Sequence, residues 1–107
     1  MHKITREAID AFQAGRNWSK DNTRVICERM PEGYKVSLFL FWHEIAKSFR
    51  TAPNGFGSLF VTLADCPTAT TRERLNGLPG VLVGQKGGKH YLNGKEISPR
   101  EWYEIKA

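Results

Sequence analysis

Cysteine is scarce in this chain of 107 residues, and long apolar runs are absent from it. The two cysteines, Cys27 and Cys66, form no C-x-x-C pair and have no histidine at ligand spacing beside them. The histidines at positions 2, 43 and 90 do not complete a set of four ligands, so the sequence predicts no zinc or other metal site. We also expect no disulfide, because the predicted location of the chain is a reducing compartment.

The sequence also lacks a segment that would direct it to a membrane. No apolar run approaches the roughly 20 residues needed to span a bilayer. Residues 1–7 have no apolar core of the kind found in a signal peptide. We therefore expect no membrane partner and a location in the cytoplasm of the cell that makes the protein.

Catalytic and cofactor-binding patterns are missing as well. His43-Glu44 and Asp65-Cys66 are the only local groupings of an acid, a base or a thiol, and neither supplies a nucleophile, a base and an orienting partner together. Residues 84–89 contain glycines and lysines but lack the G-K-[ST] ending of a phosphate-binding loop. We therefore expect no enzyme and no bound cofactor.

The composition is that of one ordinary globular domain over residues 1–107. Hydrophobic residues make up 40% of the chain and charged residues 25%, and neither a linker nor a repeat divides it. The formal net charge is +5, which favours a polyanion or an acidic protein surface as the partner.

The most informative stretch is residues 67–80, which predicts a short capped helix. Thr70 and Glu73 have the spacing of a capping box. Gly77 is suited to the left-handed residue that ends a helix, and Pro79 prevents continuation. A helix over residues 70–77 is too short to be stable alone, so it must pack against something larger. Strand formers lie on both sides of it, at positions 58–63 and 81–83.

Local signals predict two further short helices. One spans residues 5–15, with Thr5 as its N-cap and Gly15 as its stop. The other starts at Ser98-Pro99, where an N-cap is followed by proline at the first helical position.

The remaining segments predict strands. Residues 23–29 and 34–42 are rich in strand formers. Residues 38–49 leave two interpretations open: fourfold spacing of apolar residues suits a helix, whereas a hairpin that turns near His43-Glu44 fits the flanking strands, and we prefer the hairpin. Asn93-Gly94 predicts a type I′ turn inside a meander of three strands. The predicted fold class is therefore α+β, an antiparallel sheet of about five to seven strands with three short helices and a strand–short helix–strand unit at the centre.

Two segments resemble a recurring phage signature. Residues 70–81, TTRERLNGLPGV, and residues 90–95, HYLNGK, are similar to a family of unknown function among small proteins encoded by tailed phages and prophages. The hairpin over residues 38–50 resembles the middle of that family, although Trp42-His43-Glu44 replaces a smaller turn. The resemblance covers roughly residues 20–97. It implies a phage accessory protein in a bacterial cytoplasm and assigns no activity.

Our first functional hypothesis is a basic surface that binds nucleic acid without catalysis. The short helix and the hairpin over residues 85–95 carry basic, hydroxyl and aromatic side chains suited to phosphates and bases. The structural alternative is that the threonines only cap a helix and the basic side chains are solvated and discourage edge pairing of strands. The candidate contacts are Thr70, Thr71, Arg72, Arg74, Lys86, Lys89, His90, Tyr91 and Lys95.

The second hypothesis is an inhibitor or adaptor that binds a host protein, for example an anti-defence protein acting on a nuclease, a polymerase or a CRISPR effector. This function is implied by the phage resemblance. If several large aromatic side chains are exposed together, they form an interface, whereas buried ones belong to the core. The candidate interface residues are Phe39, Phe41, Trp42 and Phe56.

Overall fold

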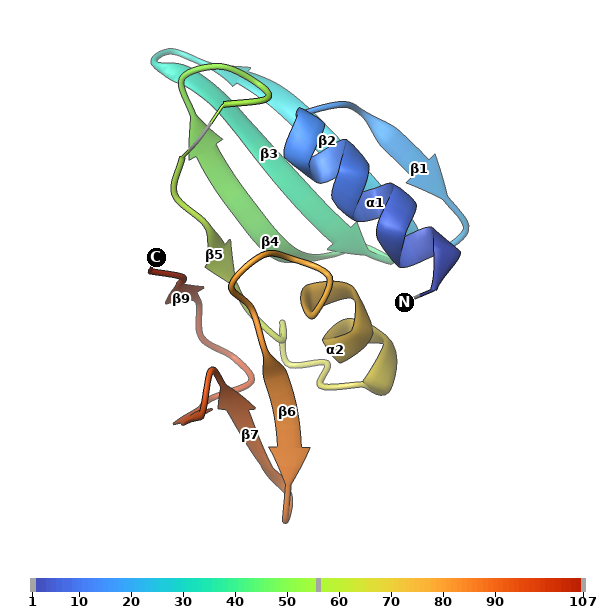
Figure 1. Ribbon diagram of the computed structural model, residues 1–107, viewed down its shortest axis with the longest axis vertical. Helices are drawn as coiled ribbons and strands as arrows, with labels where there is room; N and C mark the ends of the chain where they lie inside the picture. Colours follow the sequence, from blue (N-terminus) through green and yellow to red (C-terminus); the bar gives the residue numbers. More distant parts are fainter. Residues whose placement is uncertain (1, 56, 107) are drawn as a thin grey trace.

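Six antiparallel strands form the main sheet in the computed structural model, which describes residues 2–55 and 57–106. Their order across the sheet is β1-β2-β3-β4-β5-β9 (Figure 1). The bounds are β1 Trp18–Lys20, β2 Thr23–Met30, β3 Gly33–Leu40, β4 His43–Arg50, β5 Phe60–Val61 and β9 Tyr103–Glu104. The antiparallel α+β fold predicted from the sequence is thus confirmed.

The long strands β2, β3 and β4 form two hairpins. Each strand has 8 residues, and two-residue turns at Pro31-Glu32 and Phe41-Trp42 join them. The preferred hairpin over residues 38–49 is therefore correct and the helical alternative is wrong, but the turn lies at Phe41-Trp42, and His43-Glu44, where it was predicted, begin β4. A bulge between Leu38 and Phe39 shifts the register of β3 against β4.

A second sheet extends from the first, as the lower part of Figure 1 shows. It consists of β6 Val83–Lys86, β7 Lys89–Leu92 and β8 Lys95–Ile97, in that order. Asn93 and Gly94 have φ angles of 51° and 86°, as a type I′ turn requires. The predicted meander is thus confirmed. Its first strand starts later than expected, at Val83, because the Leu82 N–H donates to the side chain of Asn93 at 2.8 Å and not to a strand backbone.

The first helix, α1 Lys3–Ala14, packs on the main sheet over β1, β2 and β3. Gly15 has a φ of 65° and ends the helix as predicted. The predicted N-cap is wrong, because the helix begins after His2 and Thr5 is buried inside it. The buried face of α1 also contains Ala8, Ile9, Ala11 and Phe12.

The second helix, α2 Ala69–Leu75, lies between the two sheets. Its cap is Thr68, whose hydroxyl accepts a hydrogen bond from the Thr71 N–H at 3.2 Å, so the predicted capping box at Thr70 is wrong. The predicted left-handed end at Gly77 is also wrong, since the right-handed Asn76 ends the helix. Gly77 instead permits close packing: a Cβ there would lie 2.8 Å from a side-chain carbon of Ile9.

The predicted third helix, beginning at Ser98-Pro99, is wrong. That segment makes a turn in which the Ser98 N–H donates to the hydroxyl of Tyr103 at 2.8 Å. The chain then pairs as β9 with β5, and the Ile105 N–H donates to the Leu59 carbonyl at 2.8 Å. Backbone pairing with an otherwise open strand edge outweighs the local helix signals here, because one short helix contributes little stability alone.

Both helices pack on the same side of the main sheet. Apolar side chains from α1, α2, the main sheet and the start of the second sheet meet there in one core. Its largest fully buried members are Phe12, Leu38, Ile45, Leu63 and Leu75. This one-sided covering decides which side chains of the main sheet stay accessible.

Candidate functional site

Arg74, predicted to lie on a basic surface, is buried and only 6% exposed. Its guanidinium donates to the hydroxyls of Thr5 at 2.7 Å and Thr23 at 3.0 Å. It also contacts the Glu73 carboxylate at 3.2 Å, and the Thr5 hydroxyl donates to the same carboxylate. The arginine therefore joins α1, β2 and α2 inside the protein, and it is not part of an exposed binding surface.

The other predicted residues of α2 are also mostly engaged internally. Thr71 is 1% exposed, and its hydroxyl donates to the Cys66 carbonyl at 2.8 Å. Arg72 is half-buried and donates to the carbonyl of Pro67 at 3.0 Å. Thr70 is half-buried. The expected combination of two outward arginines is therefore not formed, because Arg74 points inward and bonds to Thr5, Thr23 and the half-buried Glu73 carboxylate.

The hairpin residues lie on the second sheet, where they are more accessible. Lys86, Lys89 and Lys95 are exposed, and His90 and Tyr91 are half-buried. Figure 1 shows the β6–β7 turn at the far end of the second sheet, directed away from α2. The structure thus separates the hairpin lysines from the helix with which they were expected to form one patch.

Two residues of the predicted protein interface are strongly exposed. Trp42 is 81% exposed and Phe41 56%, and their ring centroids are 6.1 Å apart in an edge-to-face arrangement. We call this pair the aromatic turn. Phe39 is half-buried beneath the guanidinium of Arg24, which lies 5.1 Å from the ring centroid. Phe56 lies outside the described residues.

The backbone holds the aromatic turn in an uncommon conformation. Phe41 has a φ of 57°, a left-handed value that costs a bulky residue of the order of 1 kcal/mol. Its N–H donates to the Asn22 carbonyl at 2.6 Å, which joins the turn to the loop before β2. Asparagine or glycine would adopt this conformation with less strain, so the two aromatic side chains are not explained by turn geometry.

A groove lies beside the aromatic turn. It has a volume of about 450 Å³. Polar side chains and backbone line it together with the two rings. The lining residues are Ser19, Asp21, Asn22, Thr23, Arg24, Phe41 and Trp42. One acidic and one basic side chain therefore accompany the exposed rings.

The side of the main sheet opposite the helices forms a second accessible surface, which we call the open face. The strand register identifies the residues of this face, because side chains alternate between the two sides along a strand and directly paired residues of antiparallel strands point to the same side. It carries aromatic, aliphatic and charged side chains. Its accessible or half-buried residues are Arg24, Ile26, Glu28, Met30, Lys35, Phe39, Glu44, Lys47, Phe49, Phe60 and Glu104, and the buried Ser37 lies beneath them.

The basic side chains of the open face are paired with an acid or stacked on rings, as Arg24 is on Phe39. The Lys35 ammonium lies 3.1 Å from the Glu44 carboxylate. The Lys47 ammonium lies 4.1 Å from the ring centroid of Trp102, which adjoins β9. Phe49 is 42% exposed and packs edge-to-face on Phe60. The open face is therefore aromatic and close to neutral.

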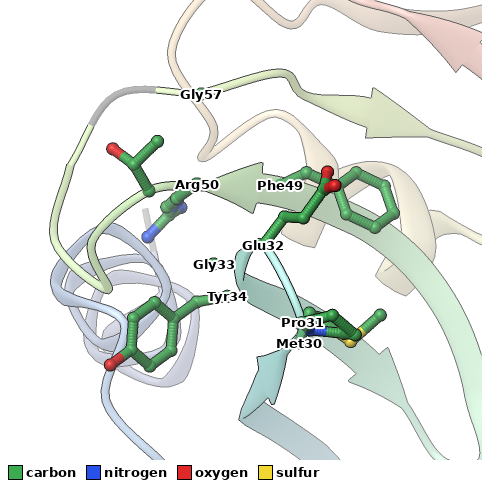
Figure 2. A pocket seen from close by; sticks show the side chains of 9 residues that line it. Met30, Pro31, Glu32, Gly33, Tyr34, Phe49, Arg50 and Gly57 are labelled. Atoms are coloured by element: carbon green, nitrogen blue, oxygen red, sulfur yellow. The ribbon is translucent and has the colours of Figure 1, made fainter.

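An apolar pocket occupies the end of the main sheet opposite the aromatic turn (Figure 2). Its volume is about 630 Å³, within the range of ligand-binding pockets. Figure 2 shows Met30 and Pro31 on one side and Phe49 on the other, with Glu32 beside them. We call it the Met30 pocket. The remaining lining residues are Gly33, Tyr34, Arg50, Thr51 and Gly57.

The inner wall of the Met30 pocket is fixed by Arg50. This residue is 7% exposed, and it donates to the carbonyls of Phe12 and Pro53, each at 2.7 Å, and to the Ser48 hydroxyl at 2.9 Å. Burial lowers the pKa of the Arg50 guanidinium, and the nearby Cys27 opposes that shift. Because its Nε and Nη1 donors bond to Ser48, Phe12 and Pro53, Arg50 supports the pocket wall.

Residues 2–55 and 57–106 offer little other chemistry. No three His, Cys, Asp or Glu side chains there group closely enough to hold a metal ion. Cys27 and Cys66 are free and half-buried. Neither helix in this part of the chain is long and apolar enough to cross a membrane.

Sequence analysis missed the open face and the Met30 pocket. A partial signal was present in β3, where Val36, Leu38 and Leu40 alternate with Lys35, Ser37 and Phe39. The pocket gave no such signal: it depends on the β2–β3 turn meeting the end of β4, which are separated in sequence.

The fold and these surfaces describe a small α+β protein that presents aromatic side chains at one end and on one face of its main sheet. The chain belongs to a family of phage proteins: the model described as Kyanoviridae Gp96 protein matches residues 1–106. The phage resemblance seen in the sequence is thus confirmed and extends over more of the chain. Neither a curated protein nor a solved structure matches it.

Proposed function

We propose that this phage protein is a non-catalytic binding protein that contacts a host protein in the bacterial cytoplasm, as an inhibitor or an adaptor. The exposure of Trp42 and Phe41 carries the proposal. A tryptophan buries up to about 250 Å² at an interface, which corresponds to about 5 kcal/mol of favourable transfer before the costs of association. Tryptophan is also among the residues most enriched at the energetic centres of protein interfaces.

The strained backbone supports the same function. Phe41 adopts a left-handed conformation in the turn, where smaller residues fit with less strain. The turn therefore presents two large rings at a cost in stability, a pattern typical of a functional site.

The charge of the open face favours a protein over a nucleic acid as the partner. The basic residues Arg24, Lys35 and Lys47 are balanced by the acidic residues Glu28, Glu44 and Glu104. A phosphate backbone laid across this surface would meet carboxylates as well as cations. A protein surface with mixed charges and apolar side chains matches it better.

The test is affinity capture from nuclease-treated lysate of infected host cells, with wild-type protein, Trp42→Ala and Leu82→Ala. Leu82 is a matched control, because it is 68% exposed and lies at the start of the second sheet. We expect a host protein that wild type and Leu82→Ala retain and that Trp42→Ala binds at least about tenfold more weakly. Equal retention by all three, or no partner, contradicts the proposal.

Nucleic-acid binding through the second sheet is the second candidate. The exposure of Lys86, Lys89 and Lys95 favours it, and Gly87-Gly88 leaves the turn open to close approach by a phosphate. Lys89 also lies 3.8 Å from the Glu96 carboxylate, which reduces the available positive charge. A mobility-shift assay at two salt concentrations tests this candidate. Binding should fall with added salt and should weaken in Lys86→Ala/Lys89→Ala. Binding that is unchanged by salt and by the double substitution rules out this candidate.

A further inference from the structure

The main sheet carries a protruding aromatic pair at one end and an apolar pocket at the other. The aromatic turn joins β3 to β4, and the Met30 pocket surrounds the turn that joins β2 to β3. The two features therefore lie at opposite ends of β3, which has 8 residues and spans about 26 Å.

We propose that the occupant of the Met30 pocket is the aromatic turn of a second copy of this chain. The inference rests on the proposed role of the aromatic turn as a protein-binding surface and names one partner for it. Such a contact joins unlike surfaces, so each copy can donate its turn to one neighbour and accept the turn of another.

Size and apolar character match across this contact. The pocket has a volume of about 630 Å³ and apolar walls from Met30, Pro31 and Phe49 (Figure 2). A tryptophan ring inserted between them contacts a thioether, a proline ring and an aromatic edge, which are favourable neighbours for an indole. Met30 and Phe49 are 37% and 42% exposed in the single chain, so the walls are open to a ligand.

The backbone segments that surround the pocket approach each other closely, which fixes the positions of its walls. A Cβ at Gly33 would lie 2.2 Å from the Arg50 carbonyl oxygen, and a Cβ at Gly57 would lie 2.0 Å from that of Phe49. Only glycine fits at these positions. The β2–β3 turn and the segment after β4 are therefore held together against the end of the sheet, with the apolar side chains as the projecting walls.

The charges at the two ends also permit the contact. Arg24 and Asp21 line the groove beside the aromatic turn. Glu32 lines the Met30 pocket, and the Arg29 guanidinium lies 5.9 Å from the ring centroid of Tyr34 in the pocket wall. Each end thus offers one acid and one base, so opposite charges are available on both sides of a head-to-tail contact.

The contact is small, so the association is weak. Two aromatic side chains and their surroundings bury less than a standard protein interface, and contacts of that small size belong to the weak, transient class. We expect wild-type protein to be monomeric when dilute and to form a concentration-dependent series of larger species, measured by sedimentation velocity.

Two variants test the two halves of the contact separately. Trp42→Ala removes the inserted ring but leaves the pocket, and Met30→Glu places a charge in the pocket but leaves the ring. Each alone should weaken self-association at least about tenfold. Leu82→Ala, a matched exposed residue away from both ends, should associate as wild type does.

Mixing the two defective variants gives the decisive result. The intact turn of Met30→Glu can enter the intact pocket of Trp42→Ala, and no further contact is then available. The mixture should therefore form a one-to-one dimer and nothing larger. A wild-type protein that stays monomeric at millimolar concentration, normal assembly of Met30→Glu, or no dimer in the mixture overturns the inference.

The proposal that the aromatic turn binds a host protein is tested separately from self-association. If Met30→Glu still retains the host protein in the capture experiment while Trp42→Ala does not, the aromatic turn binds a host protein whatever the outcome for self-association. If self-association behaves as expected but no host protein depends on Trp42, the second copy is the partner of the turn and the host-protein function is wrong.

Discussion

Replacing Arg74 by alanine should destabilise the protein far more than replacing Arg72, although both lie on α2 two residues apart. The Arg74 guanidinium is almost fully buried and bonds to Thr5, Thr23 and Glu73. Its removal leaves a carboxylate and two hydroxyls without their donor. Breaking a buried charged network by removing one partner costs about 3–5 kcal/mol.

Arg72 is the matched control. It is half-buried and makes one hydrogen bond in the described part of the chain, to the carbonyl of Pro67. Losing one such bond costs about 0.5–1.5 kcal/mol. The expected difference between the two variants is therefore about 2–4 kcal/mol, a large share of the 5–15 kcal/mol typical of a domain.

Urea unfolding of wild type, Arg74→Ala and Arg72→Ala measures the difference in unfolding free energy, from the midpoint of each transition and the slope of free energy against urea concentration. Glu73→Gln on each background completes a double-mutant cycle and reports the coupling between the two charges. Equal midpoints for Arg74→Ala and Arg72→Ala would refute the assignment of Arg74 to the interior.

Two further substitutions test the local geometry. Gly33→Ala should lower the free energy of unfolding by at least about 2 kcal/mol, because its Cβ would lie 2.2 Å from a backbone oxygen at a φ of 145°. Gly84→Ala is the control and should change the unfolding midpoint little, because nothing lies within 4 Å of its Cβ. Equal shifts of the midpoint in the two variants would contradict the close approach at Gly33. Thr68→Ala should lower the free energy of unfolding by about 1 kcal/mol, because it removes the cap of α2, and Thr70→Ala should lower it clearly less. Thermal unfolding compares the two variants, and a larger loss for Thr70→Ala would indicate that Thr70 is the cap.

Several elements could be predicted because neighbouring residues specify them. Asn93-Gly94 makes its turn because these two residues tolerate positive φ, and Gly15 ends α1 for the same reason. Alternating apolar residues in β2 and β3 specify strands, since one face of the sheet is buried. The phage signature was also readable from short segments of sequence.

The predictions that failed concern residues whose roles are set by distant partners. The spacing of Thr70 and Glu73 permits a capping box, but Glu73 pairs with Arg74 and Thr5, and the latter lies 68 positions away in the chain. Ser98-Pro99 can start a helix, but β5 offers backbone groups that need partners. A buried charge or an unpaired strand edge costs more than one helix cap contributes, so the long-range contact prevails.

The local chain thus specifies turns, strands and the phage family, because those depend on conformational preferences within a few residues. Which arginine is buried, which face of the sheet stays uncovered and where the Met30 pocket forms depend on how α1, α2 and the end of β4 pack together. Exposure is a property of the packed molecule, so the sequence could name Phe41 and Trp42 as candidate interface residues, but their accessibility and the open face follow only from the packing of the helices on one side of the sheet.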